Sequence, residues 1–88
     1  MVILVDPPKW RFRGRLWGHL VSDDSYEELH EFAAGLGIPR RAFYRDHYDL
    51  PEERLAAAQA AGALLVTSRE LVTRLTDSGL RRPKRRGP

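Results

Sequence analysis

The sequence contains no cysteine among its 88 residues. This absence excludes disulfide bonds, thiolate metal sites and thiol nucleophiles, and it is compatible with a reducing compartment. Asparagine is also absent, glutamine occurs once, and nearly all cations are arginine. A scarcity of heat-labile amides is a tendency of thermophilic proteins, so the composition points weakly toward a thermophilic source.

Long apolar runs are also missing, since none approaches the ~20 residues that a helix needs to span a bilayer. Residues 1–6 lack the basic start and the small-residue cleavage site of a secretory signal. We therefore expect a cytoplasmic protein with no membrane partner. The sequence has no Walker motif and no Gly-x-Gly-x-x-Gly, so we expect no nucleotide cofactor. It also lacks the Gly-x-Ser-x-Gly elbow and His-Glu-x-x-His.

Length and charge predict one folded domain over residues 1–79 and a basic, disordered tail over residues 80–88. The tail holds five of the 15 cations and no acid. The rest of the chain therefore has ten cations and 12 acids, which gives it a small negative net charge. Such a tail has too little apolar content to fold. A chain of this size buries only roughly 60% of its unfolded surface, so assembly into a homo-oligomer is one way to bury more.

Hydrophobic patterning predicts an α/β domain with a four-stranded mixed or mostly parallel sheet and three helices, in the order β-β-α-β-α-β-α. Short apolar runs rich in β-branched residues predict the strands, and helical spacing behind capping-box pairs predicts the helices. The expected strands are 2–5, 15–22, 42–44 and 63–66. The expected helices begin near 24–25, 52 and 67–68, and end near 36, 61 and 76.

Polar side chains follow several of the predicted strands. In parallel sheets ligands bind beyond the carboxyl ends of the strands, so groups at these positions would converge. His30 lies early in the first helix near the same rim, and His19 lies a few residues below it. If the first two strands form an antiparallel hairpin, Asp6 goes to the opposite end instead. The groups that follow strands are Asp6, Asp23, Asp24, His47, Asp49, Thr67 and Ser68.

This constellation predicts a divalent metal site. Histidine nitrogen with aspartate oxygen suits Zn, Mn or Fe, and three protein ligands with an open position allow hydrolysis; Zn, Mn and Mg are the ions to test. His47 and His30 are the candidate catalytic groups. A metal-free alternative is acid–base chemistry by His47 with Asp49, or by two histidines. The candidate metal ligands are His19, His47, Asp49 and Asp6.

Each of these residues also has a purely structural interpretation. Asp24 and Asp49 have the spacing of helix caps. His30 lies on the apolar stripe of its helix, where a histidine is often half-buried and hydrogen-bonded. His19 in a strand can bond a neighbouring carbonyl group, and Asp6 before two prolines can simply end a strand.

A second functional hypothesis is nucleic-acid binding, because aromatic and cationic side chains alternate after the first strand. Bases stack on aromatic rings for roughly 1–3 kcal/mol each, and arginine neutralises phosphates. The basic tail would add non-specific affinity. The alternative is an amphipathic strand with a solvated basic face. The residues concerned are Trp10, Arg11, Phe12, Arg13, Arg15 and Trp17.

Five segments together resemble a known family. They are Val5-Asp6, Trp17-Gly18-His19-Leu20, Glu28-Leu29-His30-Glu31-Phe32-Ala33, His47-Tyr48-Asp49-Leu50 and Ser68-Arg69-Glu70-Leu71-Val72. This pattern, which spans residues 1 to about 76, is similar to the small bacterial and phage proteins grouped as domain of unknown function 4031. The resemblance implies a shared fold and directs attention to His19, His30, His47 and Asp49. It implies no activity.

The sequence therefore leaves three hypotheses. The first is a metal-dependent hydrolase acting on a phosphodiester or nucleic acid, with Arg11, Arg13 and Arg15 holding the substrate. The second is a non-enzymatic module that binds nucleic acid or protein through the basic aromatic segment and the tail. The third is a small subunit of a larger assembly.

Overall fold

The computed structural model describes residues 2–82 and contains a mixed sheet of six strands, two more than the sequence predicts. Neighbours run in the order β4-β5-β3-β1-β6, and β2 pairs with β3. The additional strands are β2 and β5. The sequence predicts a loop or splayed hairpin over residues 9–14 and a joint between a strand and a helix over residues 45–50. The strands are β1 (Ile3–Val5), β2 (Trp10–Phe12), β3 (Arg15–Ser22), β4 (Phe43–Tyr44), β5 (His47–Pro51) and β6 (Leu64–Leu65).

The sheet is mixed, as one of the two predicted forms, and it is not mostly parallel. β1 and β6 form the parallel pair, whereas β1–β3, β2–β3, β3–β5 and β4–β5 are all antiparallel. Tight hairpins explain two of these antiparallel pairs, β2–β3 and β4–β5, because a two-residue connection can join only antiparallel strands. Arg13 and Gly14, with φ of 53° and 77°, form the β2–β3 turn, which is the left-handed pair that such hairpins favour.

Three helices form, as predicted: α1 (Tyr26–Gly35), α2 (Leu55–Ala60) and α3 (Ser68–Asp77). Ser25 caps α1 by accepting from the Glu28 amide, and Thr67 caps α3 by accepting from the Glu70 amide. The capping-box spacing therefore located both starts. The interpretation of Asp49 as a cap is wrong, because Asp49 lies inside β5 and no side chain caps α2.

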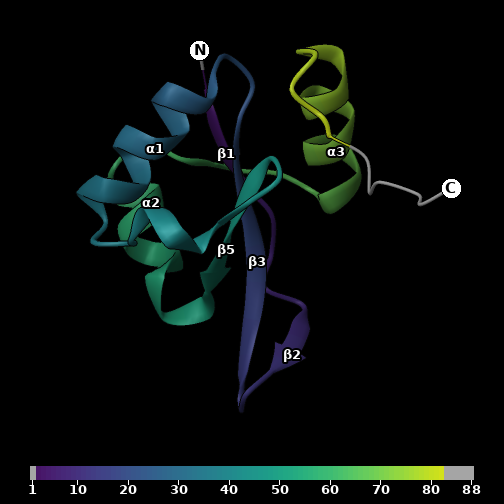
Figure 1. The fold of residues 1–88 in the computed structure, drawn as a ribbon. Helices are drawn as coiled ribbons and strands as arrows, with labels where there is room; N and C mark the ends of the chain where they lie inside the picture. The colour runs from purple at the N-terminus through teal and green to yellow at the C-terminus, as the bar shows by residue number, and fades with distance from the viewer. Residues whose placement is uncertain (1, 83–88) are drawn as a thin grey trace, which may run out of the picture.

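The sheet carries a hydrophobic layer on each face (Figure 1). On one face α1 and α2 pack on the sheet, with Leu20 of β3 and Leu29 of α1 fully buried. On the other face α3 packs through Leu71 and Leu75 against Val21 of β3. Successive residues of β3 therefore alternate between the two layers, as strand geometry requires.

The first residues after α3 lie against the domain. Leu80 packs against the layer beneath α3, and the backbone carbonyl of Leu80 accepts a hydrogen bond from the Tyr26 hydroxyl. Residues 83–88, which hold most of the predicted tail, are outside the described residues. Within residues 2–82, none of the helices has the length and apolar character needed to cross a bilayer.

Candidate metal centre

Three of the predicted polar groups meet on the face of the sheet that α3 partly covers. His19 on β3 is directly paired with Asp49 on β5, and His47 lies two residues before Asp49 on the same face. One ligand atom from each of the three lies within 4.8 Å of the others. The rings of His19 and His47 meet edge-on with centroids 5.2 Å apart.

Asp6 holds His19 in place. One oxygen of Asp6 accepts the His19 backbone amide at 2.6 Å, and the other lies 3.1 Å from Nδ1 of the His19 ring. That second oxygen also accepts the Ser68 hydroxyl at 2.7 Å, which ties α3 to the site. Asp6 is only 2% exposed. Its oxygens are therefore engaged by protein donors, and the geometry favours an orienting role over direct ligation.

β1 and β3 pair antiparallel, and yet Asp6 lies in the site. The prediction that an antiparallel first pair would send Asp6 to the opposite end is therefore wrong. β1 is short and pairs beside the middle of the longer β3, with Val5 opposite Leu20. The next residue, Asp6, therefore lies beside His19, and its amide donates to the His19 carbonyl at 3.3 Å.

Gly18 makes this close approach possible, and its role was not identified from the sequence. A Cβ atom at position 18 would lie 2.6 Å from the Asp6 carbonyl oxygen and 3.0 Å from its Oδ1. The signal was available, because glycine inside a strand often marks a close approach of another backbone.

Asp46 orients the His47 ring from its Nδ1 side, as Asp6 orients the His19 ring. Nδ1 of His47 lies 2.9 Å from Asp46 Oδ1, and Asp46 is 2% exposed. The opposite ring nitrogen, Nε2, lies 3.2 Å from Asp49 Oδ1. Asp46 was not among the predicted site residues, although its place immediately before His47 was visible in the sequence.

Contacts within the two histidine–carboxylate pairs shift the pKa values of His47 and Asp6. Burial alone would lower the pKa of His47, but hydrogen bonds to Asp49 and Asp46 outweigh burial and raise it. Burial would raise the pKa of Asp6, but hydrogen bonds from the His19 ring and amide and from Ser68 lower it instead. Both shifts favour the charged forms of His47 and Asp6.

The structure does not bring His30 to this cluster. Nδ1 of His30 lies 2.8 Å from the Tyr48 hydroxyl, and its ring packs edge-on against Phe43 at 4.7 Å. Tyr48 belongs to the layer under α1, on the opposite face of the sheet from His47. Burial, with a smaller contribution from Arg40, lowers the pKa of His30.

Asp23 and Asp24 also lie apart from the cluster, at the far end of β3. Asp23 accepts the Val2 amide at 2.9 Å and pairs with Arg74 at 3.0 Å. Because β3 runs antiparallel to β1, its carboxyl end points away from the carboxyl end of β1. Convergence at the carboxyl ends of parallel strands therefore describes Asp6 and Ser68, which follow the parallel pair β1 and β6, but not the other groups of the site.

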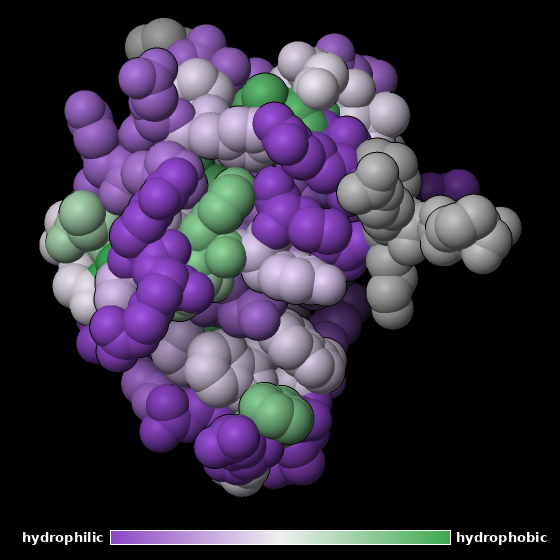
Figure 2. Space-filling model, viewed as in Figure 1, coloured by the Kyte–Doolittle hydropathy of each residue, from purple (hydrophilic) through white to green (hydrophobic). Residues whose placement is uncertain are grey.

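The basic aromatic residues form the β2–β3 hairpin, which extends beyond the rest of the sheet (Figure 1). Trp10 stacks on the His19 ring with centroids 5.3 Å apart and planes 8° from parallel. Phe12 is 52% exposed and lies beside Arg13. Figure 2 shows an isolated apolar patch near this end of the molecule, with hydrophilic residues around it. Arg15 pairs with Glu53 at 3.2 Å.

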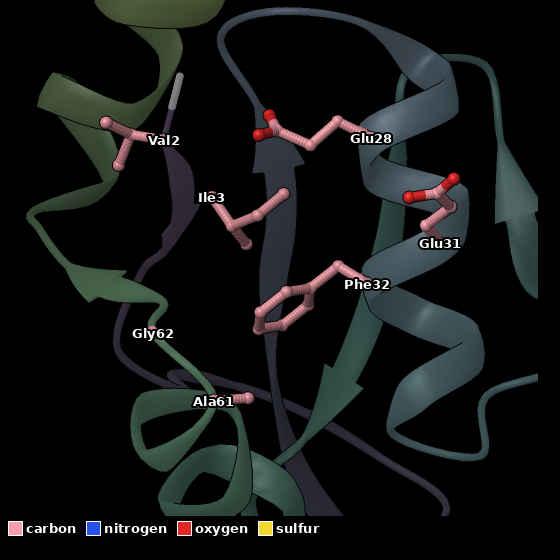
Figure 3. Close-up of a pocket in the computed structure, with 7 residues that line it drawn as sticks. All are labelled: Val2, Ile3, Glu28, Glu31, Phe32, Ala61 and Gly62. Atoms are coloured by element: carbon pink, nitrogen blue, oxygen red, sulfur yellow. The ribbon is translucent and has the colours of Figure 1, made fainter.

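Among the hollows on the surface of residues 2–82, two differ clearly in chemistry. One of about 240 Å³ contains the cluster; it is lined by Asp6, His19, Val21, Arg45, Asp46, His47, Ser68, Leu71, Val72, Leu75 and Arg81. The larger, about 490 Å³, lies between β1, α1 and the end of α2 (Figure 3). There Ile3 and Phe32 form an apolar floor with Glu28 and Glu31 at the side. It holds no histidine, so the smaller hollow is the candidate site.

Comparison with known proteins yields a family match. The model of a family described as "Protein of unknown function (DUF4031)" matches residues 3–78 of the chain. No curated protein and no solved structure matches the chain significantly.

Proposed function

The chain belongs to the DUF4031 family, and on the basis of its side chains we propose that it is a metal-dependent hydrolase. His19, His47 and Asp49 would bind one divalent ion. The observation that carries the proposal is the meeting of these three ligand atoms within 4.8 Å. Two histidines and one carboxylate are a ligand set of catalytic zinc sites, and the fourth position then holds water or substrate.

The buried carboxylates strengthen the proposal. Histidine ligands usually donate their second ring N–H to a carboxylate, a backbone carbonyl or water, which fixes the tautomer and raises the basicity of the ligand. Here Asp6 lies at Nδ1 of His19 and Asp46 lies at Nδ1 of His47. Each Nε2 is then the nitrogen left for an ion, and the His47 Nε2 already lies beside Asp49.

A bound divalent ion would lower the pKa of its water and polarise the bond to be cleaved. This chain's own residues would orient the ligands and position the substrate. We propose a phosphodiester or nucleic acid as substrate, because arginine side chains lie around the site. Arg45 and Arg81 line the same hollow as His19 and His47. The exposed Trp10 next to His19 offers a stacking surface for an aromatic group.

Metal binding is tested by thermal unfolding of chelator-treated protein with Zn²⁺, Mn²⁺ or Mg²⁺ added. At about 100 times the dissociation constant, a bound ion stabilises the native state by about 2.7 kcal/mol. Each kcal/mol raises the unfolding midpoint of a domain this small by roughly 4–8 °C. We expect such a rise for the wild type with at least one ion, and its loss in His47→Ala and Asp49→Asn.

His30→Gln is the matched control, because it also removes an imidazole but on the opposite face of the sheet. It is expected to keep the full metal-dependent rise from its own starting midpoint. A wild type that responds to none of these ions, or a response that survives in Asp49→Asn, would refute the metal centre. Because the same ligands also suit Fe²⁺, an anaerobic Fe²⁺ titration completes the series.

A second candidate function is a non-enzymatic module that binds nucleic acid or protein through the β2–β3 hairpin. The observation that favours it is the exposure of Trp10 and Phe12, 40% and 52%, beside the exposed Arg11 and Arg13. In this case His19 would support the stacked Trp10, and metal would not be required.

A further inference from the structure

We infer that the 240 Å³ hollow binds a phosphate ester, with Arg45 and Arg81 as the groups that hold the phosphate. The inference assigns the phosphate of the proposed substrate to these two arginines, and it rests on the proposed function for the reaction. Binding of the phosphate rests on the hollow alone and needs no metal ion. The two can therefore fail separately.

Arg45 is held in an unusual backbone conformation beside the site. It occupies the two-residue turn between Tyr44 and His47, the last pair of the β4–β5 hairpin. Its φ is 56°, in the left-handed region that favours glycine. A non-glycine residue in such a position carries strain that is often found at functional sites. A glycine would form this turn with less strain, so the backbone alone does not explain an arginine at position 45. A role of its side chain would explain it.

One donor of the Arg45 side chain also lacks an acceptor among the described residues. Its Nε is buried and has no hydrogen-bond partner among residues 2–82. A buried donor without an acceptor destabilises the fold, and more so when the group is charged. The guanidinium lies over the Tyr44 ring at 4.7 Å, which fixes its plane but satisfies no N–H group. An oxygen atom of a bound anion would supply the missing acceptor.

The acids that line the hollow are already engaged by protein donors. Asp46 receives the His47 ring at one oxygen and the Arg82 backbone amide at the other, at 2.9 and 2.8 Å. Arg81 Nη1 forms an ion pair with Asp46 at 3.9 Å, a distance too long for a hydrogen bond. Asp6 is engaged in the same way on the other side of the hollow by His19 and Ser68. Cationic donors therefore remain for a ligand.

The shape and lining of the hollow indicate an ester. Phosphate takes two parallel hydrogen bonds from an arginine fork, which suits Arg45 and Arg81. The volume of about 240 Å³ exceeds several times the ~30 Å³ that one water molecule occupies, so an attached organic group also fits. The apolar wall of the hollow presents Val72, which is 40% exposed, to such a group; the buried side chains beside it are Val21, Leu71 and Leu75.

The test follows the side-chain N–H signal of Arg45 by nitrogen-15 NMR in chelator-treated protein. Inorganic phosphate and a small phenyl phosphate ester are titrated at constant ionic strength, with chloride as the balancing anion. We expect a saturable shift of this signal with both, and tighter binding of the ester because of the apolar wall. Acetate, titrated in the same way, tests a carboxylate ligand.

Two substitutions at position 45 separate binding from folding. Arg45→Gln is expected to weaken ester binding at least about tenfold, the equivalent of one lost charge-assisted hydrogen bond. Arg45→Gly suits the left-handed turn, so it should fold at least as stably as the wild type and bind equally poorly. Arg81→Gln should also weaken binding, whereas Arg41→Gln is the exposed control with the same charge change.

An unshifted Arg45 signal in the wild type would overturn the inference, and so would unchanged binding in Arg45→Gly. Equal binding of acetate and phosphate would overturn the assignment of the ligand as a phosphate. Saturable phosphate binding in a protein that takes up no metal would sustain this inference and refute the hydrolase. Metal uptake without phosphate binding would refute this inference and leave the proposed metal centre standing.

Discussion

At the scale of single residues, the candidate site consists of two imidazole rings held by two buried carboxylates. Asp6 and Asp46, each 2% exposed, fix the Nδ1 side of His19 and His47. A buried carboxylate is costly unless hydrogen bonds satisfy it, and here each accepts several. The rings are thereby held before any ligand arrives, which lowers the cost of binding one.

Gly18 gives the sharpest prediction at this scale. In Gly18→Ala the new methyl group would lie 2.6 Å from the Asp6 carbonyl oxygen, so the backbone at Asp6 must move. We expect a loss of about 1–3 kcal/mol in the free energy of unfolding, as for other overpacked sites. Urea denaturation measures it, and metal binding should weaken as Asp6 moves away from His19.

Gly35→Ala is the control for this substitution. Gly35 ends α1, and a Cβ atom there would meet nothing within 4 Å. The unfolding free energy of Gly35→Ala should therefore stay within about 1 kcal/mol of the wild type or rise. Equal losses at positions 18 and 35 would contradict the close approach as the cause.

At the scale of elements, the β2–β3 hairpin carries the basic aromatic residues away from the body of the sheet. Trp10 and Trp17 are direct partners across the hairpin, and Trp17 Nε1 donates to the Phe12 carbonyl at 2.9 Å. These contacts brace a hairpin that is otherwise exposed. Among the described residues, its charged contacts with the rest of the chain are the Arg15–Glu53 and His19–Asp6 pairs.

If this hairpin binds single-stranded nucleic acid, its free arginines set the salt dependence. Replacing Arg11 and Arg13 together by Gln should weaken binding of a fluorescent oligonucleotide and reduce the slope of log affinity against log salt by about 1.4, since each phosphate contact contributes ~0.7. Fluorescence anisotropy at several salt concentrations measures both effects.

Arg40→Gln with Arg41→Gln is the control of equal charge, located on the short turn before β4. The hairpin hypothesis requires that this control keep the slope of the wild type. Parallel losses in both double variants would indicate attraction by net charge alone.

At the scale of the whole molecule, stability should depend on pH through His30. Burial lowers the pKa of His30 below its ordinary value of 6.5, and its ring is hydrogen-bonded to Tyr48. The unfolded chain then binds a proton more readily than the folded chain. The contribution of neutral His30 to the free energy of unfolding is therefore complete above pH 6.5. It is lost as the pH falls through the lower pKa of His30 in the folded state.

The measurement is the free energy of unfolding between about pH 5 and pH 8, in wild type and in His30→Gln. The variant should lose less stability than the wild type on acidification. His47, whose pKa is raised, acts with the opposite sign, losing its contribution as the pH rises. Subtracting the unfolding free energy of His30→Gln from that of the wild type at each pH removes the contribution of His47, which both proteins share. If the two proteins lose stability equally on acidification, the role of His30 is refuted.

Local chemistry was readable from the sequence. The three helices, the caps at Ser25 and Thr67 and the alternation of β3 all depend on neighbours within a few residues. The sequence also singled out His19, His47 and Asp49, together with Asp6 and His30, because of their places near one rim of the predicted sheet. Family membership followed from motifs that are local as well.

Only the tertiary structure decided which of these groups meet. β5 was not recognised as a strand because Asp49 and Pro51 are rare in strands, and pairing with β3 overrides that preference. The same pairing brings Asp49 opposite His19, whereas His30 lies on the other face of the sheet. Strand direction and register depend on contacts between residues distant in sequence. Local patterns therefore identified the side chains, and the long-range pairings decided which of them form the site.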